Sequence, residues 1–194
     1  MTSPVTSEND VPTPDSGGAL RSPLPTAGQD GAGVVTPTAF KSIFRHHPAG
    51  VTVVTFAHGG TRYGFTATSV ISVSADPPVL TFSIDSSSSS WPALAEAETL
   101  VVNFLAAAQV EVSARFATRG IDRFAEGGWS VLPTGEPVLE GSPSWVRGRI
   151  VQRTAIGRSF LVSILALEAH ESEHTSPLVY HDRTYHTVGD HTAI

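Results

Sequence analysis

The chain contains, along its length, short runs of β-branched, aromatic and other apolar residues, some of which are bounded by turn residues such as Gly59-Gly60 and Asp85-Ser86. Residues 51–57 and 79–84 are runs of this kind, and residues 99–105 and 160–167 repeat the pattern later in the chain. Runs of this length are typical of strands that need neighbouring strands to be stable. The sequence therefore predicts a mainly β fold, a β-barrel with short helical inserts.

Residues 1–35 differ in composition from the rest of the chain. They are rich in Ser, Thr, Pro, Gly and acidic residues and carry few large apolar side chains. Such a segment buries too little surface to offset the entropy that is lost on ordering. We therefore predict a disordered N-terminal arm over residues 1–35 and one folded domain over residues 36–194.

The domain is predicted to open with a helix. Thr36 is a good N-cap residue, and Pro37 suits the first helical position. Phe40, Ile43 and Phe44 then fall on one face at helical spacing, which predicts an amphipathic helix.

Further helices are expected in the middle of the chain. Residues 91–98 are predicted to form a short helix with Ser90 as its N-cap. Residues 106–118 are predicted to form another helix, with Val110, Ala114 and Ala117 facing inward.

Composition excludes several classes of function. The net charge of −6 argues against a general nucleic-acid binder and against a binder of anionic membranes. The chain has no cysteine, which removes disulfides and thiolate chemistry and fits a reducing, cytoplasmic location. No apolar run is long enough to span a bilayer, and no signal-peptide pattern is present.

Several familiar catalytic motifs are missing from the sequence. It contains no G-x-S-x-G elbow and no G-x-G-x-x-G after a strand, so neither a hydrolase triad nor a Rossmann site is predicted. His46 and His47 are adjacent, and neighbouring residues on a helix do not share a face. We therefore predict no metal site.

Hydroxyl groups gather instead at the ends of two predicted strands. Residues 66–69 follow the first of these strands, and the loop at residues 85–90 follows the second. Donors gathered at strand ends suit a phosphate or a polar heterocycle without burying a net charge. Because the hydroxyls cluster rather than spread over the surface, a purely structural barrel is disfavoured.

The same region carries an ordered series of motifs. They are GFTATS at residues 64–69, SVS at 72–74, DPP at 76–78, SWP at 90–92 and NFL at 103–105. In this order they resemble the flavin reductase-like family of FMN-binding split barrels, the small partners of two-component flavin monooxygenases. The resemblance covers roughly residues 38–188.

The resemblance implies a Greek-key split β-barrel and an NAD(P)H:flavin oxidoreductase. The cofactor would be FMN or FAD, with NADH or NADPH as co-substrate and a separate flavin-dependent monooxygenase as the recipient of reduced flavin. The resemblance also implies a homodimer. In such an enzyme hydride passes directly between stacked rings, so no acid or base side chain is required, and no catalytic residue is predicted.

The resemblance also implies a set of flavin-binding residues, and most of them lie in the hydroxyl-rich segments or at the end of the strand at 99–105. They are Thr66, Ala67, Thr68, Ser69, Ser83, Asp85, Ser88, Ser89, Ser90, Asn103, Phe104, Leu105, Phe116, Arg123 and Phe124. Arg123 is the candidate partner of the phosphate and Arg115 the second candidate, although either fits a solvated helix charge equally well. For Asn103 the alternative is a turn or capping role, and for Phe116 and Phe124 it is plain core.

One position departs from the family pattern. Where many members have Gly-Asp-His near the nicotinamide, this chain has Gly157-Arg158-Ser159. Arg158 and Ser159 are therefore the nicotinamide-proximal candidates, and Arg158 suits a nucleotide phosphate such as that of NADPH. The departure also leaves an alternative function open, a flavin-binding protein that lacks nicotinamide-dependent reduction and carries flavin or uses bound FMN on another substrate.

Overall fold

The structure, a computed structural model, describes residues 33–172 and 175–193. The predicted disordered arm therefore lies outside the described residues except for its last three positions. The strands are β1 (Ala49–Gly50), β2 (Thr52–His58), β3 (Thr61–Ala67), β4 (Ile71–Ala75), β5 (Pro78–Asp85), β6 (Thr99–Phe104), β7 (Trp129–Val131), β8 (Pro137–Leu139), β9 (Ser144–Ile156), β10 (Ser159–Glu171), β11 (Leu178–His181) and β12 (Thr184–Thr187). The helices are α1 (Pro37–Arg45), α2 (Trp91–Glu96) and α3 (Val110–Ala117), with 3₁₀ turns η1 (Ala107–Gln109) and η2 (Asp190–Thr192).

A seven-stranded antiparallel sheet forms the centre of the fold, in the order β3-β2-β6-β9-β10-β5-β4. The sheet curls, because Phe65 on β3 and Phe82 on β5 bring their ring centroids within 5.9 Å although four strands lie between β3 and β5 in the pairing order. The prediction of a mainly β fold is confirmed. Backbone pairing does not join β3 to β4 within the described residues, so a closed barrel stays a prediction.

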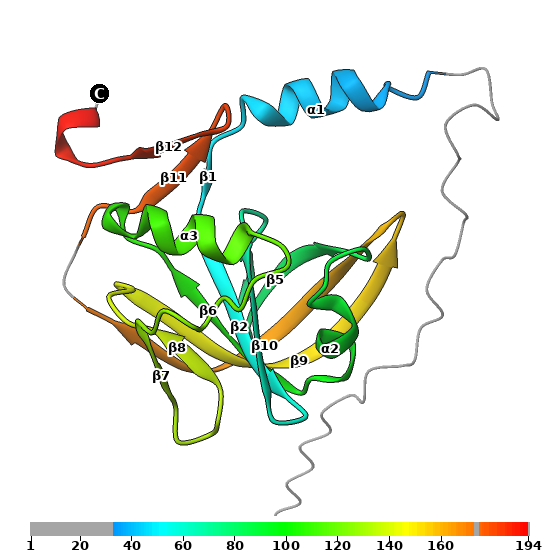
Figure 1. The fold of residues 1–194 in the computed structure, drawn as a ribbon. Helices are drawn as coiled ribbons and strands as arrows, with labels where there is room; N and C mark the ends of the chain where they lie inside the picture. Colours follow the sequence, from blue (N-terminus) through cyan, green and yellow to red (C-terminus); the bar gives the residue numbers. More distant parts are fainter. Residues whose placement is uncertain (1–32, 173–174, 194) are drawn as a thin grey trace, which may run out of the picture. The chain divides into compact units, whose positions relative to one another are not determined.

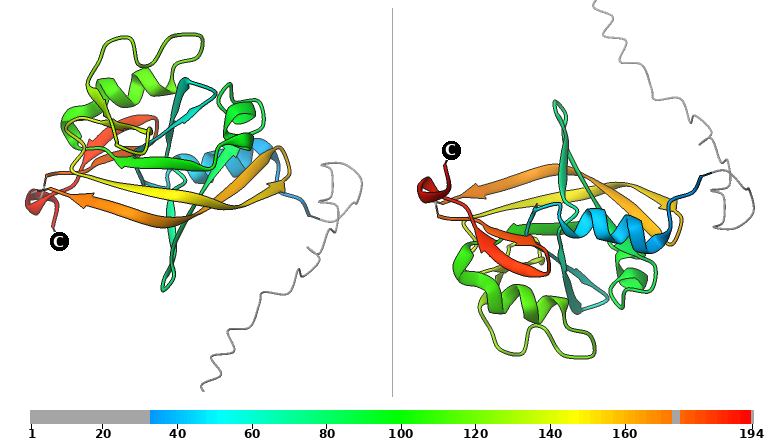
Figure 2. Two further views of the ribbon diagram at one scale, coloured as in Figure 1. Left: turned by 90° about the horizontal axis from the view of Figure 1, so that it is seen from below. Right: turned by 90° about the horizontal axis from the view of Figure 1, so that it is seen from above.

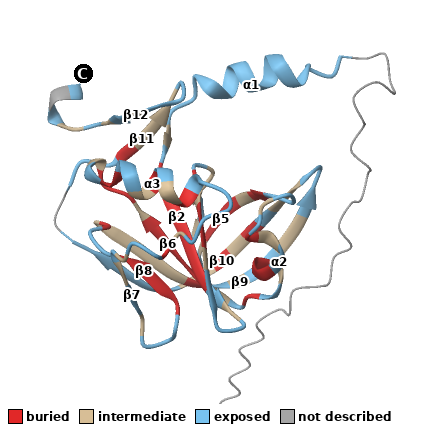
Figure 3. Cartoon of the chain, in the orientation of Figure 1, coloured by how far each residue is buried: buried red, intermediate tan, exposed pale blue. Residues whose placement is uncertain are grey.

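The inside of the curled sheet holds the main hydrophobic core. Val54, Phe56, Phe82, Leu100 and Ile164 are among its fully or almost fully buried side chains. Burial of this apolar area is the main favourable contribution to folding. Figure 3 shows the buried positions following β2, β6 and β10 through the middle of the molecule. The runs that predicted these strands are therefore apolar because the strands line this core.

Two long strands extend the sheet beyond the predicted bounds. β9 and β10 pair over most of their length, whereas the sequence predicted strands only over residues 144–152 and 160–167. They form the long hairpin seen in yellow and orange in Figure 1, with α2 beside its tip. The ends of this hairpin are polar. The apolar pattern that predicts a strand is therefore absent there, although the backbones of β9 and β10 remain paired.

Four short strands, β1, β4, β7 and β8, were not predicted. β4 pairs with β5 and presents Ile71 and Val73 to solvent, and β7 pairs with β8 in a small separate sheet. Alternating serines in β4 and prolines beside β8 give these segments the composition of loops, and only pairing with a neighbour makes them strands. The third sheet, β1-β11-β12, contains the C-terminal hairpin that the strand pattern at residues 178–180 and 184–188 predicts.

Helix α1 begins as predicted. The Thr36 hydroxyl accepts a hydrogen bond from the Ala39 N–H at 3.2 Å, and Pro37 is the first helical residue. The predicted apolar face also forms, but Phe40, Ile43 and Phe44 are 53, 65 and 58% exposed. The Asp182 N–H donates to the Arg45 carbonyl at 2.9 Å, which ties the end of the helix to the β11–β12 turn. The described chain therefore anchors α1 at one end and leaves its apolar face uncovered (Figure 1).

The inward face predicted for the helix at 106–118 is wrong. Val110, Ala114 and Ala117 are exposed, and the buried residues of α3 are Ser113 and Phe116. The buried face carries one large apolar side chain, Phe116, and a serine, Ser113, whose hydroxyl bonds to the Tyr185 hydroxyl at 3.0 Å. A search for apolar residues at helical spacing therefore selects the face with Val110 and the two alanines instead.

The role predicted for Ser90 also differs. Ser90 does precede α2, but its backbone is helical and its side chain makes no cap hydrogen bond. The hydroxyl is buried and lies 3.5 Å from the Gly64 carbonyl of β3, to which it donates. Ser90 therefore fastens α2 to the sheet rather than capping the helix, which ends at Glu96 and not at residue 98.

The described helices are all short. None of them is both long and apolar enough to cross a lipid bilayer.

Candidate functional site

The hydroxyl-rich end of β3 lies against the hydroxyl-rich end of β5. The Ser69 hydroxyl donates to the Ser83 carbonyl at 3.2 Å and accepts from the Ser83 N–H at 3.0 Å. Thr66 donates to the Ser113 carbonyl of α3 at 2.6 Å. Three segments far apart in sequence thus meet through hydroxyl groups, and both hydroxyls have structural partners.

Between these hydrogen-bonded hydroxyls lie residues whose side chains are exposed to solvent. Thr68 is exposed, and its neighbour Ala67 is buried with its carbonyl accepting from the Thr52 hydroxyl at 2.8 Å. On the facing loop, Ser89 is exposed and Ser88 is half-buried. Thr68 and Ser89 are therefore the hydroxyls of this region that are best placed to meet a ligand from solvent.

The loop at residues 85–90 is held in shape by its own hydrogen bonds. An Asp85 carboxylate oxygen accepts from the Ser87 N–H at 2.7 Å, and the Asp85 carbonyl accepts from the Ser88 N–H at 2.9 Å. Hydrogen bonds from Ser87 lower the pKa of Asp85, and the nearby Arg158 and Arg119 lower it further. The serine run is therefore an ordered turn with a carboxylate at its start, and two arginines lie near enough to act on that carboxylate.

Arg123 closes one end of this loop. Its Nη1 donates to the Gly64 carbonyl at 2.6 Å and lies 3.4 Å from the Ser90 hydroxyl, and its Nε and Nη2 donate to the Thr118 carbonyl at 3.0 and 2.8 Å. Burial, and then the neighbouring Arg119, lowers the pKa of Arg123 from its usual value. An arginine stays protonated nonetheless, so a cation is fixed between β3 and the serine loop.

No carboxylate neutralises Arg123 within the described residues. The ion pairs found there are Arg115–Glu126 and Arg147–Glu136. Arg115, the second candidate for a phosphate, is thus already engaged, with Nη1 2.7 Å from a Glu126 oxygen. Between the two arginines, the structure favours Arg123 as the one with positive charge to offer an anion.

Phe116 and Phe124 lie beneath this end of the site. Both are buried, their ring centroids are 5.2 Å apart in an edge-to-face arrangement, and Phe124 packs in the same way on Trp129. Phe116 also packs under Gly64, where an added Cβ would lie 2.6 Å from its ring. The two phenylalanines therefore support β3 from inside, and their contact with a flavin remains a prediction.

The motif at residues 103–105 is divided between the scaffold and a pocket. The Asn103 amide donates to the Val53 carbonyl and the Thr55 hydroxyl, each at 3.0 Å, and its oxygen accepts from the Leu139 N–H at 2.9 Å. Asn103 is fully buried and its amide is fully used inside the protein. Leu105 is buried in the second core cluster, so neither side chain is exposed to a ligand.

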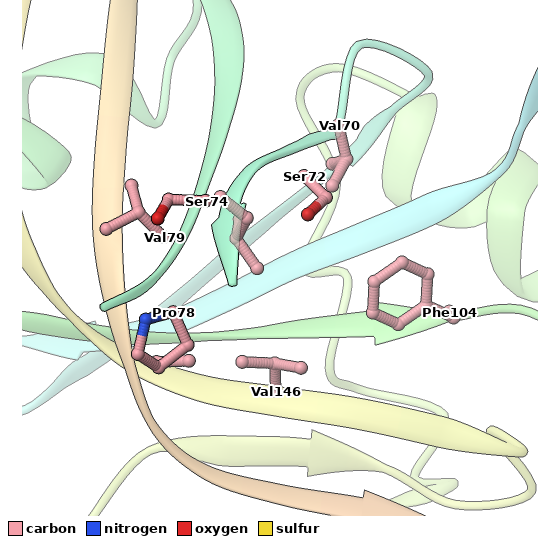
Figure 4. A pocket seen from close by; sticks show the side chains of 9 residues that line it. Val70, Ser72, Ser74, Pro78, Val79, Phe104 and Val146 are labelled. Carbon is pink, nitrogen blue, oxygen red and sulfur yellow. The ribbon is translucent and has the colours of Figure 1, made fainter. Parts of the chain in front are cut away.

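Phe104 lines an apolar pocket of about 290 Å³ near the end of β3. The other lining residues come from β4, β5, β9 and β10 and from the segment after β3, and they are Val70, Ser72, Ser74, Pro78, Val79, Leu80, Val146 and Ala166. Figure 4 shows the Phe104 ring, Val146 and Pro78 around this space, with Val70 and Ser72 above it. Ser72, Ser74 and Pro78 belong to the SVS and DPP motifs of the family pattern, but they were not among the predicted site residues.

The nicotinamide-proximal candidates lie at the tip of the long hairpin. Gly157 and Arg158 form the turn between β9 and β10, and Ser159 pairs with Asp85. The Arg158 carbonyl accepts from the Ser86 N–H at 2.9 Å, so the tip adjoins the serine loop. Arg119 was not among the predicted site residues. It lies close enough to lower the pKa of Asp85 and of Arg123, and no motif around it in the sequence indicates this role.

A metal centre is not supported by this arrangement. Over residues 33–172 and 175–193, no cluster of three or more His, Cys, Asp or Glu side chains has the geometry to hold a metal ion.

Comparison with known proteins places this site in a family. The model of the flavin reductase like domain matches residues 44–189. A protein named NADH:FMN oxidoreductase from Rhodococcus qingshengii is 45% identical over 152 residues, which cover 76% of this chain and 79% of that protein.

Solved structures have the same fold. The flavin reductase domain protein of Arthrobacter sp. FB24 is 38% identical with a TM-score of 0.76, over 79% of this chain and 96% of the other. BorF, the flavin reductase component of a bacterial two-component tryptophan halogenase, is 28% identical with a TM-score of 0.74, over 80% and 99% of the two chains. The chain therefore belongs to the flavin reductase-like family.

Proposed function

We propose that the protein is an NAD(P)H-dependent flavin reductase that supplies reduced FMN or FAD to a separate flavin-dependent oxygenase. The observation that carries the proposal is the 45% identity to an NADH:FMN oxidoreductase over 76% of the chain. The alternative, a flavin carrier without nicotinamide-dependent reduction, rested on Gly157-Arg158-Ser159 alone. Similarity at this level over the whole folded region outweighs a difference at the tip of one hairpin.

The residues present fit a flavin nucleotide. Arg123 has no carboxylate partner among the described residues and lies against Gly64 in the middle of β3, whereas an apolar pocket that contains Phe104 lies near the end of that strand. At the rise of a strand, Gly64 and Ala67, the last residue of β3, are about 10 Å apart. A molecule with a phosphate at one end and a fused ring system at the other matches this polarity.

We assign the phosphate end of the flavin to Arg123 and to the hydroxyls of Ser88 and Ser89, because the backbone N–H groups of Ser86, Ser87 and Ser88 already bond within the protein. Thr68 would face the middle of the molecule, and Phe104 with Val70 would pack on the ring. Ser69, Ser83, Ser90 and Thr66 would act by holding these segments in place, because their hydroxyls or backbone groups already bond across the site. Asn103 fastens β6 to β2 and β8 under the same surface.

Flavin held by these residues would supply the ring that takes up hydride from the nicotinamide, and it would leave the site in its reduced form. The protein's contribution would be to hold both rings in stacking contact and to donate hydrogen bonds to the ring that gains charge. Hydride transfer between the two rings would need no titrating side chain.

We further propose that the protein acts as a homodimer in the cytoplasm. The uncovered apolar face of α1 supports the dimer, together with the exposed Ile71 and Val73 of β4, whose hairpin with β5 projects beyond the sheet in both views of Figure 2. Exposed apolar patches of this kind are usually contact surfaces. The lack of cysteine supports the proposed location.

The proposed function is tested by anaerobic reduction. Purified protein is mixed with FMN or FAD and with NADH or NADPH, and the loss of the flavin's visible absorbance is followed. Reduction far above the protein-free rate is expected with at least one nucleotide. Flavin that binds but is reduced no faster than in the control with either nucleotide would overturn the proposal in favour of the carrier.

A further inference from the structure

The tip of the β9–β10 hairpin is held firmly although it is exposed. The Ser86 N–H bonds to the Arg158 carbonyl at 2.9 Å on one side of the tip. Two residues further on, the Phe160 ring stacks on Trp91 with a centroid distance of 3.7 Å and an interplanar angle of 14°. The Arg158 side chain thus extends into solvent from a backbone that is fixed on both sides.

The charges around this tip form a second cationic position. Arg158 and Arg119 are both exposed and both lower the pKa of Asp85, whose carboxylate is already bonded to the Ser87 N–H. Arg123 lies at the Ser90 end of the same loop, whereas Arg158 lies at the Ser86 end. The loop therefore has one arginine at each end, and a single phosphate at Arg123 leaves the other end available.

Arginine at an exposed, fixed backbone position is well suited to a phosphate, because its planar group donates two parallel hydrogen bonds. In dinucleotide sites an arginine accommodates the 2′-phosphate that distinguishes NADPH from NADH. We propose that Arg158 binds the 2′-phosphate of NADPH and makes this protein selective for the phosphorylated co-substrate. The inference rests on the proposed function and adds the identity of its electron donor.

The first test compares both nucleotides as electron donors. The wild-type protein should reduce flavin with NADPH at a kcat/KM at least about tenfold above that for NADH, a factor that corresponds to 1.4 kcal/mol. Arg158→Ala should raise the KM for NADPH by a similar factor and leave the NADH values unchanged. Arg149→Ala, an exposed arginine on the same hairpin, is the matched control and should change neither. Equal loss with both nucleotides, or no loss with either, would overturn the inference.

A second test does not depend on turnover. Binding of 2′,5′-ADP and of 5′-AMP is measured by calorimetry on wild type and Arg158→Ala. Tighter binding of 2′,5′-ADP that disappears in the variant supports the site, and equal binding of both probes refutes it. This measurement does not depend on flavin reduction. A protein that is not a reductase would fail only the first test, whereas a protein without the 2′-phosphate site would bind both probes equally here.

Discussion

The surroundings of a single side chain decide whether it serves the scaffold or the ligand. Asn103 and Thr68 both belong to motifs typical of the family, and both carry polar groups at strand ends. Asn103 is fully buried with three hydrogen bonds inside the protein, whereas Thr68 is exposed. An unpaired buried amide would cost about 1–3 kcal/mol, so Asn103 keeps its partners and cannot also turn toward a ligand.

Arg123 should distinguish a phosphorylated flavin from an unphosphorylated one. In Arg123→Lys the charge stays but the forked donor is lost, so FMN affinity should fall about tenfold while riboflavin affinity is unchanged. Fluorescence titration of both flavins measures the ratio. Arg115→Lys, whose native arginine pairs with Glu126, is the matched control. A parallel loss for riboflavin would show that Arg123 only supports the fold.

The ion pair of Glu136 and Arg147 should stabilise the fold without taking part in the site. Glu136 is 3% exposed, and its carboxylate lies 2.9 Å from Arg147. Arg147→Met leaves this buried charge unpaired and should lower the free energy of unfolding by about 3–5 kcal/mol. Urea denaturation measures the loss, with Arg149→Met as the exposed control. A loss below 1 kcal/mol would contradict this account.

The same carboxylate predicts a pH dependence of stability. Burial opposes ionisation of Glu136, but hydrogen bonds from Arg147, Thr134 and Thr99 outweigh it and lower its pKa from 4.5 to about 2. The stabilisation is therefore complete above pH 4.5 and is lost as the pH falls toward 2. In Glu136→Gln this part of the acid-induced loss should be absent when unfolding is followed between these pH values.

At the scale of elements, helices position the site by packing on one strand. Phe116 of α3 lies under Gly64 of β3, and Arg123 and Ser90 reach the Gly64 carbonyl from the loop after α3 and from the start of α2. Gly64 is thus the point where both helical segments approach the sheet. Only a residue without a side chain allows this approach, which gives the first residue of the GFTATS motif a packing role.

Gly64→Ala should push α3 away from β3. The new Cβ would lie 2.6 Å from the Phe116 ring, so a destabilisation of about 1–3 kcal/mol is expected together with weaker flavin binding. Adding Phe116→Leu should restore part of both, as judged by thermal unfolding and flavin titration. Gly148→Ala, whose Cβ would meet the Leu165 backbone oxygen at 2.7 Å, is the contrast that no side-chain trimming should rescue. Failure of the double variant to recover would place the strain elsewhere.

At the scale of the whole molecule, the described residues leave apolar surface that none of them covers. The face of α1 with Phe40, Ile43 and Phe44 is the clearest case, since these large side chains are all more than half exposed. Covering them would contribute roughly 25 cal/mol per Å² of apolar area. A second copy of the chain presents the same helix and therefore doubles the gain in a symmetric contact.

Introducing charge on the apolar face of α1 should therefore dissociate the proposed dimer without unfolding the chain. Phe40→Glu combined with Phe44→Glu is expected to halve the mass measured by light scattering while the circular dichroism spectrum is retained. Lys41→Glu, a charge reversal between the two positions, is the control and should leave the mass unchanged. A wild-type protein that is monomeric at micromolar concentration would remove the proposal.

Local sequence determined much of this protein. Short runs of β-branched and aromatic residues predicted the main strands of the central sheet, because such residues favour strands. Thr36 and Pro37 fixed the start of α1, and the order of GFTATS, SVS, DPP and NFL indicated the family and the region of the site. These features depend on neighbours along the chain, so they can be recognised without the fold.

Tertiary structure decided the rest. β4 and β8 are strands only because β5 and β7 pair with them, and the inward face of α3 is the one that packs on β3 through Phe116 and Ser113. Pairing between distant segments also gave Asn103 and Ser90 their structural roles and left Arg123 a cation without a carboxylate partner in the described residues. Such outcomes follow from contacts across tens of residues, and no local pattern carries them.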